Sequence, residues 1–344
     1  MNSDINKIIS SMNEIEIKML IDELKKLLSK QEDNLNNNLK DKCPYCNSTL
    51  FIKYGKRNNN QCYLCKNCNK TFTNKTNSLT HYSKISSEKW HTFIECEFAG
   101  MTLAETSFQV KLSKTSCFNL RHKLYAICSE YIRNIKMIGQ TELDCSYTKI
   151  NLKGTKPNNM PRLSKKRGGT SEYSGISHHK VCVIVSTDEY DNIFMKIAGL
   201  GPESYEKYKK YSDTFSQAEL IVSDSKSSIA QFSNYLGKEQ DKILVKPNIK
   251  KYTTENGNNI STVNEICKII SDITHKRHGV GTCYLNDYLS FSCIKKMISY
   301  KVERKDYYNE LTKIISNIPS QPYGIMPVDL KEAYWEYNYG IYKH

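Results

Sequence analysis

The chain has 344 residues, of which 39% are hydrophobic, and its formal net charge at pH 7 is +14. This length predicts two or three folded domains, and the hydrophobic content is sufficient for a core, so global disorder is excluded. No uncharged apolar run approaches the ~18 residues of a membrane-spanning helix. The first residues carry scattered charges, unlike a secretory signal peptide, so we expect an intracellular protein.

Two composition features point to partners. The thirteen cysteines are partly clustered, which in an intracellular chain favours metal binding over disulfides. Residues 41–80 hold seven Lys or Arg and one Asp, and residues 149–180 hold eight Lys or Arg and one Glu. A basic composition rich in Lys, Asn and Ile is also typical of an AT-rich genome. The clustering of the charge nevertheless favours a nucleic-acid partner.

The N-terminal residues 3–31 carry Ile, Met and Leu at roughly helical spacing, which predicts an amphipathic helix. The run is short and irregular for a coiled coil. The polar, Asn-rich segment 31–42 that follows is expected to be a linker.

Two CxxC motifs follow, with eighteen residues between them. Each motif puts two thiolates on one tight turn, and two such turns can close a tetrahedral four-sulfur site suited to structural Zn²⁺. The expected ligands are Cys43, Cys46, Cys65 and Cys68. Cys62 is a fifth cysteine nearby and could compete, but only Cys65 completes a CxxC motif. The basic and aromatic residues around this ribbon suit contact with a phosphate backbone, although a structural ribbon with a solvated basic face remains open.

Residues 85–135 predict two short helices and a longer third one, an arrangement that suits a helix-turn-helix motif. The third helix would present its early residues to a DNA major groove. We expect the exposed contacts to be Lys114, Thr115, Asn119, Arg121 and His122, because Asn can pair with adenine and Arg with guanine. An ordinary three-helix packing unit is the alternative.

From residue 139 the pattern changes to short apolar strands, with a basic loop at 156–180. Strands are expected at 141–150, 180–187, 192–200, 218–224 and 242–246, and helices at 203–215, 227–237, 261–277 and 284–300. This order predicts a mixed five-stranded sheet with helices added after the third strand, within a multidomain α+β chain.

Two aspartates lie in or beside this expected sheet. Asp144 interrupts a strand, and Asp224 directly follows the apolar run 220–222. Burying a carboxylate beside a sheet core is costly unless it is paired or binds a cation. Neighbouring strands could therefore hold Mg²⁺ or Mn²⁺ between the two carboxylates. Asp224 alone could equally be a helix-capping residue.

The order of these features resembles a family of bacterial insertion-sequence transposases of the DDE/D–D–N class, the ISXO2-like group. The resemblance covers residues of about 40–300. It is carried by CPYC…QCYLCKNCNKTF, SSEKWHTFIE, TELDCSYTKINLKG, MPRLSKKRGG, HHKVCVIVSTDEYDNIFMKIAG, LIVSDSKSSI and TVNEICKIISDITHKRHGVGTCYLNDYL. It implies a zinc ribbon, a helix-turn-helix and an RNase H-like α/β catalytic domain.

The resemblance also implies a catalytic set of Asp144, Asp224 and Asn264, in which the two aspartates hold two Mg²⁺ or Mn²⁺ ions. Glu265 is a possible substitute for Asn264, although it points to a different helix face. The chain departs from the family pattern at Cys145, Cys267 and Ser271, where relatives tend to have Glu, His and a DNA-contacting Lys.

The resemblance thus implies a DNA transposase that binds the terminal inverted repeats of its element and carries out metal-dependent strand cleavage and transfer on target DNA. Its basic loop, with Lys165, Lys166 and Arg167, is expected to contact DNA. A homodimer or larger synaptic complex in the bacterial cytoplasm, associated with the nucleoid, is expected. One alternative is a catalytically impaired, zinc-containing DNA-binding protein derived from a transposase. A repair nuclease with an RNase H-like domain would leave the upstream ribbon unexplained.

The expected domains divide the chain into five segments. An N-terminal helix and linker (1–40) precede the zinc ribbon (41–80), the helix-turn-helix (81–137) and the catalytic domain (138–300). The last segment is a C-terminal tail (301–344) rich in aromatic residues, for which packing onto the catalytic domain or a partner subunit is the simplest expectation.

Overall fold

A computed structural model describes most of residues 41–316, a few residues between 12 and 19, and residue 318, with gaps at 58–59, 77–78, 81–82, 152–174, 178–179, 244–252 and 277–279. The chain divides into two compact units, Met1–His81 and Tyr82–His344. Of the helix expected at 3–31, the described residues Glu16, Ile17 and Met19 are helical, and the rest lies outside the described part. No helix in the described ranges is long and apolar enough to span a bilayer.

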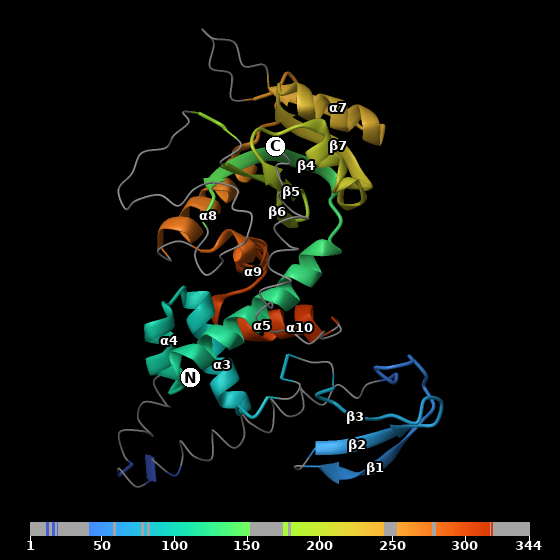
Figure 1. Ribbon diagram of the computed structural model, residues 1–344, viewed down its shortest axis with the longest axis vertical. Helices are drawn as coiled ribbons and strands as arrows, with labels where there is room; N and C mark the ends of the chain where they lie inside the picture. Colours follow the sequence, from blue (N-terminus) through green and yellow to red (C-terminus); the bar gives the residue numbers. More distant parts are fainter. Residues whose placement is uncertain are drawn as a thin grey trace, which may run out of the picture. The chain divides into compact units, whose positions relative to one another are not determined.

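The first unit contains a three-stranded antiparallel sheet (Figure 1), formed by β1 (Phe51–Arg57), β2 (Asn60–Cys65) and β3 (Thr71–Thr73). Its buried cluster is small and consists of Cys43, Tyr63, Cys65 and Phe72, with Phe51 packed against it. The rings of Tyr63 and Phe72 stack with their centroids 5.4 Å apart. Two of these four buried residues are cysteines, so the apolar core alone is a weak source of stability.

The second unit begins with three helices, α3 (Ser87–Ala99), α4 (Leu103–Val110) and α5 (Lys114–Arg133). Each begins after a capping Ser or Thr whose side chain accepts a backbone hydrogen bond, as these residue types favour. Thr102 and Glu105 form a reciprocal capping box on α4. Gly100 ends α3 with φ 75°, a left-handed conformation that glycine adopts without strain.

A five-stranded mixed sheet follows, as the sequence predicted, with strand order β6-β5-β4-β7-β8. The strands are β4 (Ile138–Lys149), β5 (Lys180–Asp188), β6 (Ile193–Leu200), β7 (Gln217–Asp224) and β8 (Glu239–Ile243). The β4–β5–β6 pairs are antiparallel, whereas β4–β7 and β7–β8 are parallel. The parallel pairing makes β4 and β7 neighbours, and it brings together strands about 80 residues apart in the sequence.

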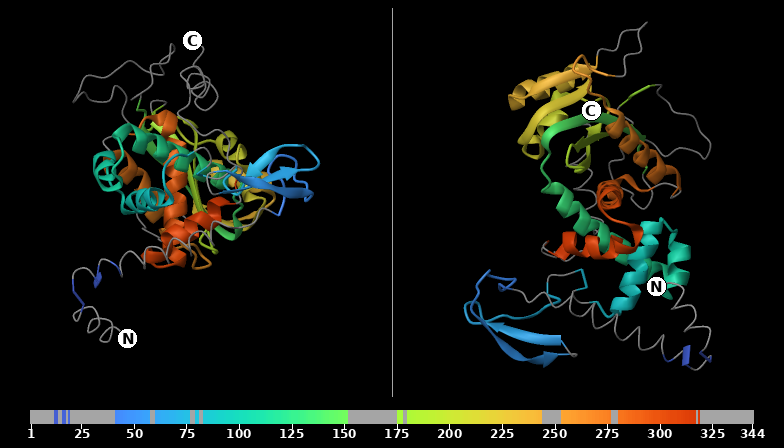
Figure 2. Two further views of the ribbon diagram at one scale, coloured as in Figure 1. Left: turned by 90° about the horizontal axis from the view of Figure 1, so that it is seen from below. Right: turned by 180° about the vertical axis from the view of Figure 1, so that it is seen from behind.

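Helices cover both faces of this sheet (Figures 1 and 2). The helix α8 (Ser261–Lys276) packs on β4 and β5, and α9 (Thr282–Lys301) packs on β6 and α5. On the other side, α7 (Ser227–Leu236) lies beside β8 and the short α6 (Tyr205–Lys209). The rings of Tyr208, Phe215 and Phe232 join this second layer to Phe194 of β6.

Two expected elements differ in the structure. The single helix predicted at 203–215 is instead α6 and a separate 3-10 helix, Ser212–Phe215. The carbonyl of Thr214 accepts a hydrogen bond from the N–H of Met137 (2.7 Å), so a tertiary contact competes with a continuous helix here. The strand β8 also begins three residues earlier than predicted, and residues 244–246 lie outside the described part.

The beginning of the C-terminal segment folds back on the second unit. A 3-10 helix (Arg304–Asp306) leads into α10 (Tyr307–Ser316), which packs on α3, α9 and α5. The ring of Tyr307 contacts Phe98, and that of Tyr308 contacts His91. Packing on the catalytic domain or on a partner subunit was expected. These two ring contacts are made with α3 instead, and α10 also packs on α9 of the expected catalytic domain. Residues 319–344 lie outside the described part.

Candidate functional site

The four cysteines of the two CxxC motifs meet in the first unit. All four sulfur atoms lie within 4.8 Å of one another. Cys43 and Cys68 are 3.7 Å apart and Cys46 and Cys65 are 3.5 Å apart, measured between the Sγ atoms. A tetrahedral zinc site with Zn–S bonds of about 2.3 Å requires sulfurs about 3.8 Å apart, whereas a disulfide needs about 2.05 Å. The cluster therefore fits a bound Zn²⁺ and is not a pair of disulfides.

Tight backbone turns bring the two cysteines of each CxxC motif together. Asn47 and Asn69 follow the two motifs with φ values of 57° and 54°, and each donates its N–H to the carbonyl of the first cysteine of its motif. The pKa of Cys65 is lowered to about 6, because the backbone N–H groups of Cys68 and Asn67 donate to its sulfur. A thiolate is the form that binds zinc. Cys65 belongs to this group and Cys62 does not, which is the choice that the CxxC spacing favours.

The expected DNA-contacting face of α5 is only partly exposed. Lys114, Thr115 and Asn119 are exposed at its N-terminal end. Arg121 and His122 were also expected there, but both are buried, at 3% and 4% exposure. That prediction is wrong because α5 turns these two positions toward the protein interior.

Arg121 instead belongs to a buried ionic network. Its Nη2 atom lies 2.6 Å from Oε1 of Glu97, and it also donates to the carbonyl of Met101 (3.1 Å). The hydroxyl of Tyr125 donates to the same Glu97 carboxylate. Burial would lower the pKa of Arg121, but the Glu97 carboxylate beside it raises that pKa above its ordinary value. Arg121 therefore joins α3 to α5 and is not available to DNA.

The two predicted aspartates converge at one end of the parallel strand pair. Asp144 lies on β4, and Asp224 is the last residue of β7. Both carboxylates contact the same ammonium group, Nζ of Lys226, at 2.9 Å from Oδ1 of Asp144 and 3.1 Å from Oδ2 of Asp224. Glu203, from the turn after β6, is the third carboxylate on this ammonium, at 3.0 Å.

This carboxylate cluster is partly withdrawn from water. The side chains of Asp144, Glu203 and Asp224 are 16%, 11% and 23% exposed. Burial raises the pKa of Asp224, and the adjacent Lys226 opposes that rise. For Lys226, burial would lower the pKa, but Asp144 and the other two carboxylates raise it overall. The cluster thus combines three carboxyl groups with one ammonium group.

The first helix after the sheet is fixed to the same strand. Oε2 of Glu142, on β4, accepts a hydrogen bond from the N–H of Val263 in the first turn of α8 (2.8 Å). A carboxylate at a helix N-terminus satisfies a free N–H and complements the helix dipole. Glu142 therefore sets where α8 begins relative to the two aspartates.

The third predicted residue, Asn264, is exposed on α8, and no contact joins its side chain to the aspartates among the described residues. It lies one turn before Cys267, on the same side of the helix. Burial and the charge of Asp144 raise the pKa of Cys267 to about 12, and its thiol interacts with Ser146. Glu265 instead pairs with Nζ of Lys296 on α9 (2.9 Å), so the structure does not support it as a substitute ligand.

The three departures from the family pattern lie in two environments. Cys145 is on the opposite face of β4 from Asp144, because successive side chains of a strand alternate, and its Sγ lies 2.9 Å from that of Cys182. Cys267 and Ser271 both line a cavity of about 530 Å³.

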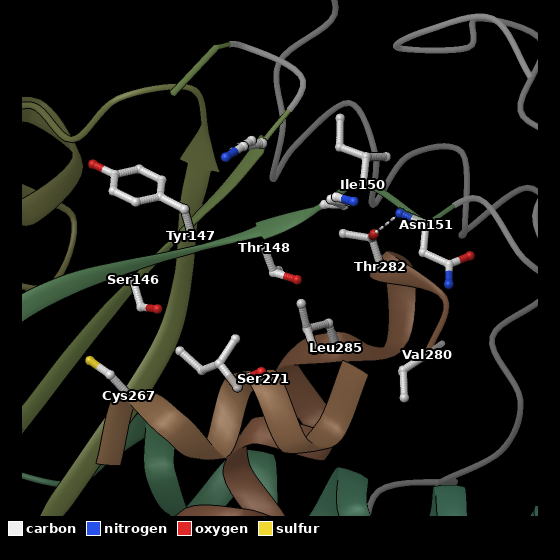
Figure 3. Close-up of a pocket in the computed structure, with 13 residues that line it drawn as sticks. Ser146, Tyr147, Thr148, Ile150, Asn151, Cys267, Ser271, Val280, Thr282 and Leu285 are labelled. Atoms are coloured by element: carbon white, nitrogen blue, oxygen red, sulfur yellow. Dashed lines mark hydrogen bonds between the residues drawn. The ribbon is translucent and has the colours of Figure 1, made fainter. Parts of the chain in front are cut away.

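The cavity lies between the end of β4, α8 and the start of α9 (Figure 3). Thr282, at the start of α9, accepts a hydrogen bond from the N–H of Asn151 (2.7 Å) and closes one side. The described lining is rich in hydroxyl groups, contains Lys149 and Lys180, and includes no carboxylate. Lys165, Lys166 and Arg167, the predicted basic contacts, lie outside the described residues.

Sequence reasoning missed Glu203, Lys226 and Glu142. Lys226 stands two residues after Asp224, so an Asp-x-Lys pattern was visible, but that pattern is common at turns. Glu203 carries no local signal, because only the fold of the sheet brings it to Asp144.

Comparisons with known proteins give one significant sequence relative. The chain is 28% identical over 136 residues to an uncharacterized protein in the transposable element ISH50 of Halobacterium salinarum. The match covers 37% of this chain and 44% of that protein, so it spans less than half of the relative's length. No protein-family profile matches the chain.

Among solved structures, the chain aligns with a pre-cleavage Mos1 transpososome at 8% identity and a TM-score of 0.22, covering 69% of this chain and 80% of that chain. It also aligns with the Mos1 strand transfer complex at 12% identity and a TM-score of 0.20, covering 67% and 76% of the two chains. TM-scores this low do not establish a shared fold.

Proposed function

We propose that this chain is a DNA transposase with an RNase H-like catalytic domain. The observation that carries the proposal is the meeting of Asp144 and Asp224 on one cationic group at the end of the parallel strands β4 and β7. Two half-buried carboxylates from segments 80 residues apart are costly to bring together unless a cation balances them. The similarity to a protein of a transposable element supports this reading of the site.

The site residues fit a divalent cation. Mg²⁺ and Mn²⁺ prefer carboxylate oxygens, and Asp144 and Asp224 each direct one oxygen to a common point about 3 Å away, where the Lys226 ammonium lies. When bound, the metal would supply Lewis-acid stabilisation of a scissile phosphate. The protein's part is to hold the two carboxylates rigidly on neighbouring strands and to keep the site partly dry.

We assign the third catalytic position to Asn264, following the resemblance. Asn264 is on the same side of α8 as Cys267, whose pKa responds to the charge of Asp144. The anchoring of α8 by Glu142 keeps this side of the helix near the strand that carries Asp144.

The DNA-binding role is assigned to the first unit and to α5. The four cysteines would hold a structural Zn²⁺, and the exposed Lys114, Thr115 and Asn119 would contact the terminal inverted repeats. The basic residues Lys165, Lys166 and Arg167 would add phosphate contacts. Because transposition joins two DNA ends, the active form would be a dimer or a larger synaptic complex.

The test is a strand-transfer assay on DNA that carries the repeats flanking the gene, with Mg²⁺ or Mn²⁺. We expect metal-dependent joining by the native protein and its loss in Asp224→Asn, with repeat binding retained. The matched control is Glu219→Gln, an exposed acid on the same strand β7, which should remain active. The proposal would be contradicted if Asp224→Asn kept its strand-transfer activity, or if the native protein joined DNA without a divalent metal.

One observation favours a second candidate, a DNA-binding protein without catalysis. A lysine ammonium already occupies the point on which the aspartates converge, and Cys267 stands beside Asp144. In that case the native protein would bind the repeats specifically but neither cleave nor join them with any divalent metal. The same assay therefore separates the two candidates.

A further inference from the structure

Lys226 makes an unusually complete set of ionic contacts. Its ammonium group has three hydrogens, and three carboxylates lie at 2.9, 3.0 and 3.1 Å from its nitrogen, those of Asp144, Glu203 and Asp224. The contact with Oδ1 of Asp144 is also a hydrogen bond, and the other two contacts are ion pairs. Lys226 therefore fills the centre of the cluster as a bound cation would.

The backbone of Lys226 is fixed separately from its ammonium group. Lys226 is the capping residue at the start of α7, and its N–H donates to Oδ1 of Asp224 (3.4 Å). Its four-carbon side chain is about one third exposed, at 34%. The ammonium group can therefore leave the aspartates without a change in the backbone.

Glu203 is held more firmly than Lys226. Its N–H donates to the hydroxyl of Tyr147 (2.9 Å), and the hydroxyl of Tyr208 donates to its Oε2 atom. Its other oxygen, Oε1, contacts Lys226. Glu203 is thus a fixed anion on the far side of the ammonium, offered by a different element from either aspartate.

The three carboxylates do not form one compact ligand set. Among the described residues, only the four cysteines bring three or more ligand atoms within 4.8 Å of one another. Mg²⁺ holds its oxygen ligands at about 2.0–2.1 Å, so two of these oxygens lie at most about 4.2 Å apart, and the three carboxylates cannot all bind one Mg²⁺ in this arrangement. We assign Glu203 to Lys226 because Tyr147 and Tyr208 already hold Glu203 in place.

Without a cation, three half-buried carboxylates would repel one another. One ammonium reduces the formal charge of the cluster from −3 to −2, which stabilises the site while it still attracts a divalent cation. A metal bound by Asp144 and Asp224 cannot share that position with the ammonium, because two cations would then occupy the same point.

We propose that Lys226 is a built-in counter-cation that a divalent metal must displace from Asp144 and Asp224, and that Glu203 retains the displaced ammonium beside the site. This inference rests on the proposed function, in which the two aspartates hold the metal. Metal binding would then require the Lys226 side chain to move. The free energy needed to break the contacts of Lys226 with the two aspartates therefore makes the observed free energy of metal binding less favourable.

The first test is Mn²⁺ binding to the zinc-loaded, full-length protein, measured by electron paramagnetic resonance and calorimetry without DNA. Lys226→Met removes the competitor, so we expect the Kd for Mn²⁺ to fall by roughly 5- to 150-fold, the usual range for coupled sites. Lys226→Arg keeps the charge and should stay near the native Kd. The matched control Lys242→Met changes an exposed lysine on β8 and should leave the Kd unchanged.

A double-mutant cycle tests the role of Glu203. In the native background, Glu203→Gln leaves Lys226 with the aspartates alone, so Mn²⁺ binding should weaken. In the Lys226→Met background the same change should weaken Mn²⁺ binding much less, because only the longer-range attraction of the Glu203 charge is lost. Equal weakening in both backgrounds would overturn the role assigned to Glu203.

The outcomes also separate this inference from the proposed function. The native protein could bind Mn²⁺ and lose that binding in Asp224→Asn, while Lys226→Met leaves the Kd unchanged. In that case only the proposed displacement of Lys226 by the metal is wrong. If neither the native protein nor Lys226→Met binds Mn²⁺, the metal-dependent function itself fails.

Discussion

At the scale of single residues, the structure gives several charged groups roles other than those their sequence context suggested. Arg121 had the chemistry of a base-reading residue, but it is buried against Glu97. Removing one member of a buried ion pair leaves the other charge without compensation, which costs far more than breaking an exposed pair. The Glu97–Arg121 pair should therefore dominate the stability of the α3–α5 contact.

The corresponding prediction concerns Glu97→Gln. This change keeps the side-chain shape but leaves the Arg121 charge buried without a partner, so the free energy of unfolding should fall by about 3 kcal/mol. Urea denaturation followed by circular dichroism measures the change. The control is Glu95→Gln, an exposed residue of the same helix, for which we expect a change within about 0.5 kcal/mol. Equal effects of the two substitutions would exclude an important role for the buried pair.

At the scale of elements, the position of α8 depends on one hydrogen bond from its first turn to β4. The carboxylate of Glu142 accepts from the N–H of Val263, and the buried face of the helix, with Val263, Ile266 and Ile270, packs on the sheet. Apolar burial gives α8 most of its stability, but it allows small rotations and shifts. The directional contact with Glu142 fixes where the helix begins.

We therefore predict a local effect of Glu142→Gln. The loss of the charge at the N-terminus of α8 should cost about 0.5–2 kcal/mol and increase amide hydrogen exchange in the first turn of the helix. Hydrogen exchange followed by mass spectrometry measures this. Exchange in α7 should stay unchanged, and a uniform increase across the second unit would contradict a local capping role.

At the scale of the whole molecule, the chain combines two units with different sources of stability. The second unit has an extensive apolar core, built from a five-stranded sheet with helices on both faces. In the first unit the described buried cluster consists of four residues, and two of them are cysteines of the four-sulfur group. Small domains of this kind are usually held by metal.

Metal removal should consequently unfold the first unit and leave the second unit folded. Cys65→Ser should abolish zinc binding and expose the amides of β1 and β2 to rapid exchange, while the second unit keeps its protection. Cys62→Ser, a cysteine of the same strand outside the group, should retain zinc at native stoichiometry. Atomic emission measures the zinc content of each variant, and hydrogen exchange measures the protection of each unit. Loss of zinc from Cys62→Ser would contradict the ligand assignment.

Much of this architecture follows from local sequence signals. The spacing of the CxxC motifs identified Cys43, Cys46, Cys65 and Cys68 as one cluster, because a tetrahedral site requires two closely spaced pairs. Alternating and continuous apolar runs predicted all five strands of the mixed sheet, and the helical pattern of residues 85–135 predicted two short helices and a longer third one, which are α3, α4 and α5. These features depend on chemistry within a few residues along the chain.

Only the tertiary structure decided which charged groups meet. Asp144, Glu203 and Lys226 share an ion cluster because the pairing of β4 with β7 and the turn after β6 bring distant segments together. Arg121 is buried because of how α5 packs on α3, which its own sequence does not specify. Electrostatic partners are set by spatial distance, which sequence separation does not determine, so the sequence could propose the two aspartates but not the lysine between them.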